Sequence, residues 1–86
     1  MHAIRKSSRD LIETDVDDET IIVALETGHL YSVKGSGLAI WRLIDGSRSE
    51  EQITAEICKQ YGIDQQTAVA DVEEFLADVK SVGLIG

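Results

Sequence analysis

The stretch that decides the fold is 28-GHLYSVKGSGLAIW-41, because the spacing of its apolar residues changes halfway along. From His29 to Lys34 the side chains alternate in type, which is typical of a β-strand. After the glycines at 35 and 37, apolar residues occur on nearly every side of a helix, namely Leu38, Ala39, Ile40, Trp41, Leu43 and Ile44. A helix that is apolar nearly all round has to be covered on most sides. We therefore expect it to end at Gly46 and to lie between a sheet and further helices.

Two further strands are predicted before this stretch, over residues 11–15 and 20–26, and the third strand covers 29–33. Turn-forming residues separate them, at Asp17 and Asp18 and again at Thr27 and Gly28. In the second strand, alternation places Ile22 and Ala24 on one face, and the other face carries Ile21, Val23 and Leu25. These short segments predict a three-stranded antiparallel meander.

Two more helices are predicted after Gly46. The first starts with Ser49 and Gln52 in the spacing of a capping box, and Gly62 ends it. Its expected buried stripe is Ile53, Ile57 and Tyr61. The second starts after Asp64, and its apolar arc is Ala68, Val69, Val72, Phe75, Leu76 and Val79. The fold class is therefore α+β, a three-stranded antiparallel sheet followed by three helices in the order β-β-β-α-α-α.

Length and charge argue against several classes of protein, namely multidomain, membrane-spanning and nucleic-acid-binding proteins. A chain of 86 residues forms one domain, predicted over residues 11–86 after a flexible tail at 1–10. No apolar run is long enough for a membrane span, and no secretory signal precedes the domain, so a cytoplasmic protein is expected. The net charge of −8 argues against nucleic-acid binding, which needs clustered Lys and Arg.

Catalysis finds little support in the sequence. The two histidines are His2, in the predicted tail, and His29, beside a turn. Cys58 fits a buried, inert thiol, and the acidic residues near Asp17 lack the spacing of a calcium loop. The segment 35-GSG-37 is too short to hold a phosphate. We expect no enzyme, no metal site and no cofactor.

Binding is better supported, because the third strand ends the meander and carries a single terminal charge, Lys34. Exposed edge strands are usually protected by proline, bulges or inward charges. Either a helix covers this edge, or the edge receives an incoming peptide strand. On the last helix, Asp71, Glu74 and Asp78 lie along one side of the apolar arc. That side predicts a second, acidic wall of a groove beside the strand.

The chain also resembles the PqqD-like family, the precursor-recognition domains of pathways that make peptide natural products from ribosomal precursors. The likeness is carried by a TGxxY hairpin (27–31), by IWxLIDG (40–46) and by DVxxFLxxxxxxGLI (71–85). It implies a winged helix-turn-helix-like fold and a precursor leader that adds as a fourth strand to the third strand. The implied pairing edge is His29, Leu30, Tyr31, Ser32 and Val33. The implied helix wall is Ala68, Asp71, Val72, Phe75, Asp78 and Val79.

The resemblance also implies partners and leaves rivals open. The leader would be delivered to a separate maturation enzyme, a peptidase or a radical enzyme, in a pathway of the lasso-peptide type or of the radical-enzyme type. Lys34 departs from the family, because many relatives carry Asn between this strand and the helix. One rival function is a winged-helix transcriptional regulator. The other is a structural subunit that forms a homodimer through the edge of the third strand.

Overall fold

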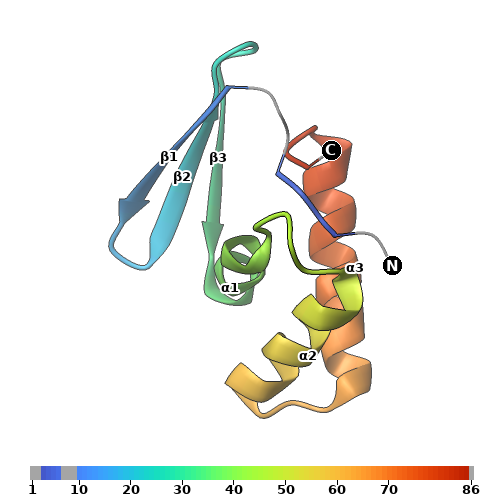
Figure 1. Cartoon of the computed structure of the whole chain (residues 1–86). Coiled ribbons are helices and arrows are strands. Elements are labelled where there is room, and N and C mark those ends of the chain that lie inside the picture. The colour runs from blue at the N-terminus through green and yellow to red at the C-terminus, as the bar shows by residue number, and fades with distance from the viewer. Residues whose placement is uncertain (1–2, 7–9, 86) are drawn as a thin grey trace.

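The structure of this chain is a computed structural model that describes residues 3–6 and 10–85. Its elements are β1 (Leu11–Val16), β2 (Glu19–Ala24), β3 (His29–Lys34), α1 (Gly35–Leu43), α2 (Glu50–Tyr61) and α3 (Gln65–Ser81). The strands form one antiparallel sheet in the order β1-β2-β3, and the helices lie on one side of it (Figure 1). The α+β class and the predicted order of elements are confirmed. The winged helix-turn-helix description stays a prediction.

The sheet buries one of its faces. Ile22 in β2 is 0% exposed, and its neighbours across the sheet are Glu13 of β1 and Tyr31 of β3. Because side chains alternate along a strand, this inner face also carries Ala24, which is buried. The predicted extension of the second strand to residue 26 is wrong. Leu25 lies in the turn after β2 and is exposed.

Helix α1 lies at the centre of the hydrophobic core. Its buried side chains are Leu38, Ile40, Trp41 and Leu43. The helix packs against β2, β3, α2 and α3, which confirms the expectation of a helix covered on most sides. It ends at Leu43, before the predicted end at Gly46, because Ile44 takes an extended conformation.

The segment after α1 forms a turn around Asp45. The backbone N–H and the hydroxyl of Ser47 donate to Asp45 Oδ1 at 2.9 and 2.7 Å, and Arg48 Nη1 donates to Asp45 Oδ2 at 2.6 Å. These hydrogen bonds, first that of the Ser47 hydroxyl, hold the pKa of the Asp45 carboxyl below its usual range. Gly46 follows with φ of 85°, a conformation that favours glycine. The turn thus ends α1 before Gly46.

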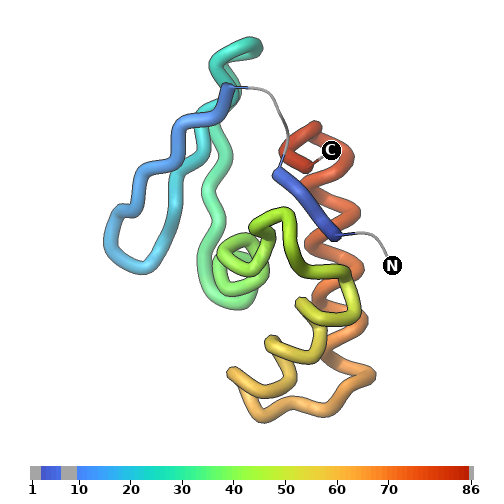
Figure 2. Tube along the Cα trace, in the orientation of Figure 1, coloured from blue at the N-terminus to red at the C-terminus, as the bar shows by residue number. Residues whose placement is uncertain are grey.

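Residues 3–6 contact the domain. Ala3 forms an isolated bridge with Ser49, and Lys6 forms another with Ile85. The Ile4 N–H donates to the Arg48 carbonyl at 2.8 Å. This part of the predicted tail therefore lies along the helices, beside the C-terminal end of α3 (Figure 2). The rest of the predicted tail, apart from Asp10, lies outside the described residues, and the domain boundary at residue 11 stays a prediction.

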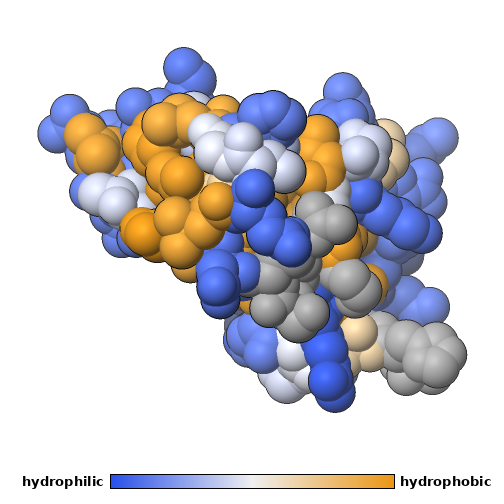
Figure 3. All heavy atoms as spheres, turned by 90° about the horizontal axis from the view of Figure 1, so that it is seen from above, coloured by the Kyte–Doolittle hydropathy of each residue, from blue (hydrophilic) through white to orange (hydrophobic). Residues whose placement is uncertain are grey.

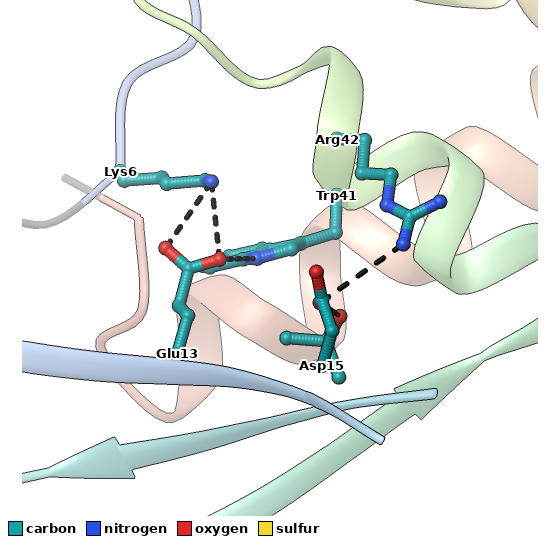
Figure 4. Close-up of polar contacts among 6 residues, drawn as sticks. Lys6, Glu13, Asp15, Trp41 and Arg42 are labelled. Carbon is teal, nitrogen blue, oxygen red and sulfur yellow. Dashed lines mark hydrogen bonds and ion pairs between the residues drawn. The ribbon is translucent and has the colours of Figure 1, made fainter. Parts of the chain in front are cut away.

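A polar cluster joins this N-terminal segment to β1 and α1 (Figure 4). Trp41 is 1% exposed, and its Nε1 donates to Glu13 Oε1 at 2.7 Å. The Lys6 ammonium lies 3.3 Å from Glu13 Oε2 and 4.5 Å from the centroid of the Trp41 ring. The buried indole therefore has a hydrogen-bond acceptor on the inner face of the sheet, and a cation over its ring.

Helices α2 and α3 form the remaining layer. Gly62 ends α2 in the left-handed conformation, as predicted, and Ile53 and Ile57 are 0% exposed. The prediction that Tyr61 completes this stripe is wrong, because Tyr61 is 48% exposed. Thr54 is buried instead, and its hydroxyl donates to the Glu50 carbonyl at 2.8 Å. That bond satisfies the hydroxyl and lets a polar side chain face the core.

The capping box at the start of α2 is confirmed. Gln52 N–H donates to Ser49 Oγ at 3.3 Å, and Ser49 N–H donates to Gln52 Oε1 at 2.8 Å. We expect Ser49→Ala to lower the free energy of unfolding by about 1 kcal/mol, because it removes an acceptor from an N–H that the helix cannot satisfy. Urea unfolding followed by circular dichroism measures the change. Gln52→Ala, which keeps the Ser49 acceptor, should cost less, and equal losses would contradict this assignment.

Within the described residues, no helix combines the length and apolar character needed to cross a bilayer.

Candidate peptide-binding site

Strand β3 has one free edge. Within the described part of the chain it pairs only with β2, and no strand lies along its other side. The strand ends in α1, which packs against it without replacing a neighbouring strand (Figure 1). The backbone groups along this edge are therefore available to pair with an added strand.

The five predicted edge residues divide between the two faces of the sheet. His29, Tyr31 and Val33 belong to the inner face, where Val33 is buried and Tyr31 is half-buried. Leu30 and Ser32 belong to the outer face, and Leu30 is 64% exposed. Ser32 Oγ donates to Glu19 Oε2 at 2.6 Å. An added strand would thus meet inner side chains that are ordered by the core and outer ones that face solvent.

The rings of His29 and Tyr31 contact each other at the start of β3. Their centroids lie 6.3 Å apart at an interplanar angle of 89°, and Tyr31 Oη lies 3.4 Å from His29 Nδ1. This edge-to-face arrangement restrains both rings on the inner face.

The six predicted residues of the helix wall do not all reach the surface. Ala68 and Val72 are 0% exposed and Val79 is 4% exposed, so their side chains belong to the core. Asp71 and Phe75 are half-buried, and Asp78 is exposed. Ala68 belongs to the predicted apolar arc of this helix, and packing against the rest of the core buries it completely.

Asp71, Phe75 and Asp78 come together in one hollow between α3 and α1. The hollow has a volume of about 220 Å³, and its other lining residues are Glu74 of α3 and Ser36, Gly37 and Ile40 of α1. Three of the seven lining residues are acidic and none is basic. The hollow therefore offers a small apolar floor beneath an acidic rim, which suits a side chain that is apolar, cationic or both.

A close approach between two helices shapes this hollow. A Cβ atom placed on Gly37 would lie 3.2 Å from Cδ1 and Cε1 of the Phe75 ring. Glycine at position 37 therefore lets the ring rest against the first turn of α1. Ser36, Gly37 and Ile40 are site residues that the sequence reading missed, although the small residues of 35-GSG-37 were the available signal.

The hollow and the edge of β3 are neighbours that α1 keeps apart. No β3 residue lines the hollow, and the predicted groove between β3 and α3 stays a prediction. Among the described residues, no Cα atoms of β3 and α3 come within 8 Å of each other, and α1 packs against both. A strand added to the free edge of β3 would lie about 4.8 Å from it, on the side of the sheet nearest α3 (Figure 1).

Among the described residues, no three His, Cys, Asp or Glu side chains lie close enough together to hold a metal ion. Cys58, expected to be buried, is half-buried and lines a separate hollow between α2 and α3 with Thr54 and Val69.

Comparisons with known proteins agree with this geometry. Residues 19–85 match the family described as coenzyme PQQ synthesis protein D (PqqD). A solved structure described as TbiB1 in complex with the TbiA(beta) leader peptide is 29% identical, with a TM-score of 0.83 over 93% of each chain. A second, described as lasso peptide synthetase B1 complexed with the leader peptide, is 12% identical, with a TM-score of 0.84 over 96% of each chain, and shows the shared fold alone.

No curated protein matches the chain. The family match covers most of the sequence and contains β2, β3 and all three helices. It also includes the free edge of β3 and the hollow between α1 and α3. The chain belongs to the PqqD family.

Proposed function

We propose that this chain recognises the leader segment of a ribosomally made precursor peptide and presents the precursor to a separate modifying enzyme. The leader binds as a fourth antiparallel strand on β3. The observation that carries this proposal is the free edge of β3 beside the hollow between α1 and α3. The likeness to TbiB1, a protein described in complex with a leader peptide, supports it. The domain itself catalyses no step and acts in the cytoplasm, where precursors are synthesised.

The site residues take two roles in this proposal. The backbone from His29 to Val33 pairs with the leader, and Asp71, Phe75 and Asp78 contact its side chains. Ala68, Val72 and Val79 lie in the core beneath them, so they position α3 and do not contact the leader. Because side chains of a strand alternate, every second leader residue would point inward toward α1 and α3.

Magnitudes indicate what the leader has to contain. About five ladder hydrogen bonds contribute roughly 0.5–1.5 kcal/mol each, whereas association costs roughly 4–15 kcal/mol of translational and rotational freedom. Backbone pairing alone would therefore bind weakly. Two or three apolar anchors, at about 1.5–3 kcal/mol each, would bring the affinity to the micromolar range. Sequence preference would then come from the inward-pointing side chains of the leader.

Fluorescence polarisation tests the proposal, with leader peptides of precursors whose genes lie next to the gene for this protein. We expect saturable binding that Phe75→Ala weakens about tenfold, because the ring forms the apolar part of the hollow. Val69→Ala is the matched control. It also shortens an apolar side chain of α3, but Val69 lines the hollow on the α2 side. A folded protein that binds no such leader, or equal effects of the two variants, would contradict the proposal.

The acidic rim predicts a salt-dependent contribution from basic leader residues. Asp71→Asn combined with Asp78→Asn should weaken binding about twofold to fivefold at low salt, and the difference should shrink as ionic strength rises. Glu73→Gln removes a charge from the same helix outside this hollow and should have no such effect. A leader affinity that is unchanged by the double substitution at all salt concentrations would exclude a role for the rim.

The two rival functions make different predictions. A homodimer paired through β3 would show a mass by light scattering that rises with concentration and falls when leader is added, since both use one edge. A transcriptional regulator would retard duplex DNA in a gel at low salt.

A further inference from the structure

The outer face of the sheet carries an apolar row that no described helix covers. The strand register aligns Ile12 of β1, Val23 of β2 and Leu30 of β3 across this face. Ile12 is 48% exposed and Leu30 is 64% exposed, and Val16, on the same face of β1, is 44% exposed. Seen from above, hydrophobic atoms gather on the side of the molecule that carries the sheet (Figure 3).

This row is unusual for the solvent side of a small antiparallel sheet. Such faces are commonly polar when the opposite face packs on the core. Here the neighbouring row follows that rule at its ends, with Thr14 and Ser32, but the row of Ile12, Val23 and Leu30 does not. Contiguous exposed apolar patches are often surfaces that bind another protein, whereas single exposed apolar side chains are common on any surface.

The row runs up to the free edge of β3. A leader strand paired with that edge would place every second side chain on the outer face, next to Leu30. The outer face of the leader-bound domain would therefore consist of three strands of this chain and one of the leader. A partner covering this face would contact both molecules at once.

We propose that the outer face of the sheet is the docking surface for the modifying enzyme, and that the enzyme prefers the leader-bound domain. This inference rests on the proposed leader-recognition function. The enzyme would contribute an apolar patch bordered by Lys and Arg. Those cations would meet the acidic turn of Asp17 and Asp18 and the net charge of −8.

Size and charge together argue for this occupant over a second copy of the chain, because a second copy would bring only the same small face and the same negative charge. Three strands of six residues cover roughly 14 by 20 Å, about 280 Å², whereas a stable interface buries about 800 Å² on each partner. Two copies would also each bring a charge of −8. The leader strand and further enzyme contacts would supply the missing area. The enzyme would then bind the complex more tightly than the free domain, and it would tighten leader binding by the same factor.

The test uses the purified modifying enzyme and the leader peptide that are encoded beside this chain. Biolayer interferometry measures the affinity of the immobilised enzyme for the full-length domain, with and without saturating leader. We expect at least a tenfold preference for the leader-bound domain, and a loss of at least tenfold in enzyme affinity with Ile12→Lys. Ile12→Thr keeps a β-branched residue in the strand and should show a smaller loss in the same direction. Ala55→Lys, an exposed position on α2, is the matched charge control and should change nothing.

Leader affinity, measured by fluorescence polarisation without enzyme, separates this inference from the proposed function. Ile12 lies on β1, two strands from the pairing edge, so its variants should keep leader affinity within about twofold. If leader binds normally but Ile12→Lys and Ile12→Thr leave enzyme affinity unchanged, the docking surface is refuted and the proposed function stands. Equal enzyme affinity for free and leader-bound domain also refutes it. The docking surface is also refuted if light scattering detects a homodimer that Ile12→Lys dissociates. Absence of leader binding to the wild-type protein would overturn both.

Discussion

Leader peptides N-methylated at alternate residues should fall into two groups with very different affinities for this protein. In a strand paired with the edge of β3, every second N–H of the peptide points to β3, and the intervening ones point away. A methyl group on an N–H that faces β3 removes a hydrogen bond and also separates the two backbones. We expect each such methyl to lower affinity at least about tenfold, because the lost bond leaves its partner unpaired in addition to the steric conflict.

The intervening positions provide the matched control for this experiment. A methyl there points away from β3 and removes no hydrogen bond to it, so it should change affinity by no more than about threefold. Fluorescence polarisation competition with singly methylated peptides measures both groups. Because the protein is unchanged, its stability cannot confuse the result. A uniform loss at all positions, or a loss without alternation, would contradict strand addition and favour a helical or irregular bound leader.

Of the substitutions considered for this chain, Trp41→Ala should lower the free energy of unfolding the most. The indole, in the last turn of α1, is 1% exposed, and truncation of such a side chain costs about 3–5 kcal/mol through lost burial and the cavity left behind. A domain of this size has a total stability of roughly 5–15 kcal/mol. We therefore expect Trp41→Ala to unfold at a much lower urea concentration than the wild-type protein. Circular dichroism measures this midpoint.

Lys6→Ala separates the packing of Trp41 from the polar cluster around it. It removes the cation over the ring and the pair with Glu13, but leaves the indole in the core. The expected loss is about 0.5–1 kcal/mol. A Lys6→Ala effect as large as that of Trp41→Ala would mean that the docking of residues 3–6, and not core packing, dominates the stability of this region.

The sequence was informative wherever one short segment settles its own structure. Alternation identified β3, the Ser49 and Gln52 pair identified the start of α2, and Gly62 identified its end. Local hydrogen bonding and backbone geometry determine these features, so neighbours in sequence suffice to predict them. The errors were also local in kind. The hydrogen-bonded turn around Asp45 follows the early end of α1, and the buried side of α2 includes Thr54 but not Tyr61.

The sequence by itself determined the fold class, the place of β3 at the end of the meander and the acidic side of α3, because strand and helix periodicity are properties of single segments. It left open whether a helix covers the edge of β3, and the structure shows that edge unpaired within the described residues. Only the tertiary structure decided which residues of the predicted α3 wall reach the surface. It also showed that Ser36, Gly37 and Ile40 complete the hollow. The periodicity of a helix gives the angle between its own side chains. Its rotation against a neighbouring helix is set by packing between segments far apart in the chain, such as the contact of Phe75 with Gly37.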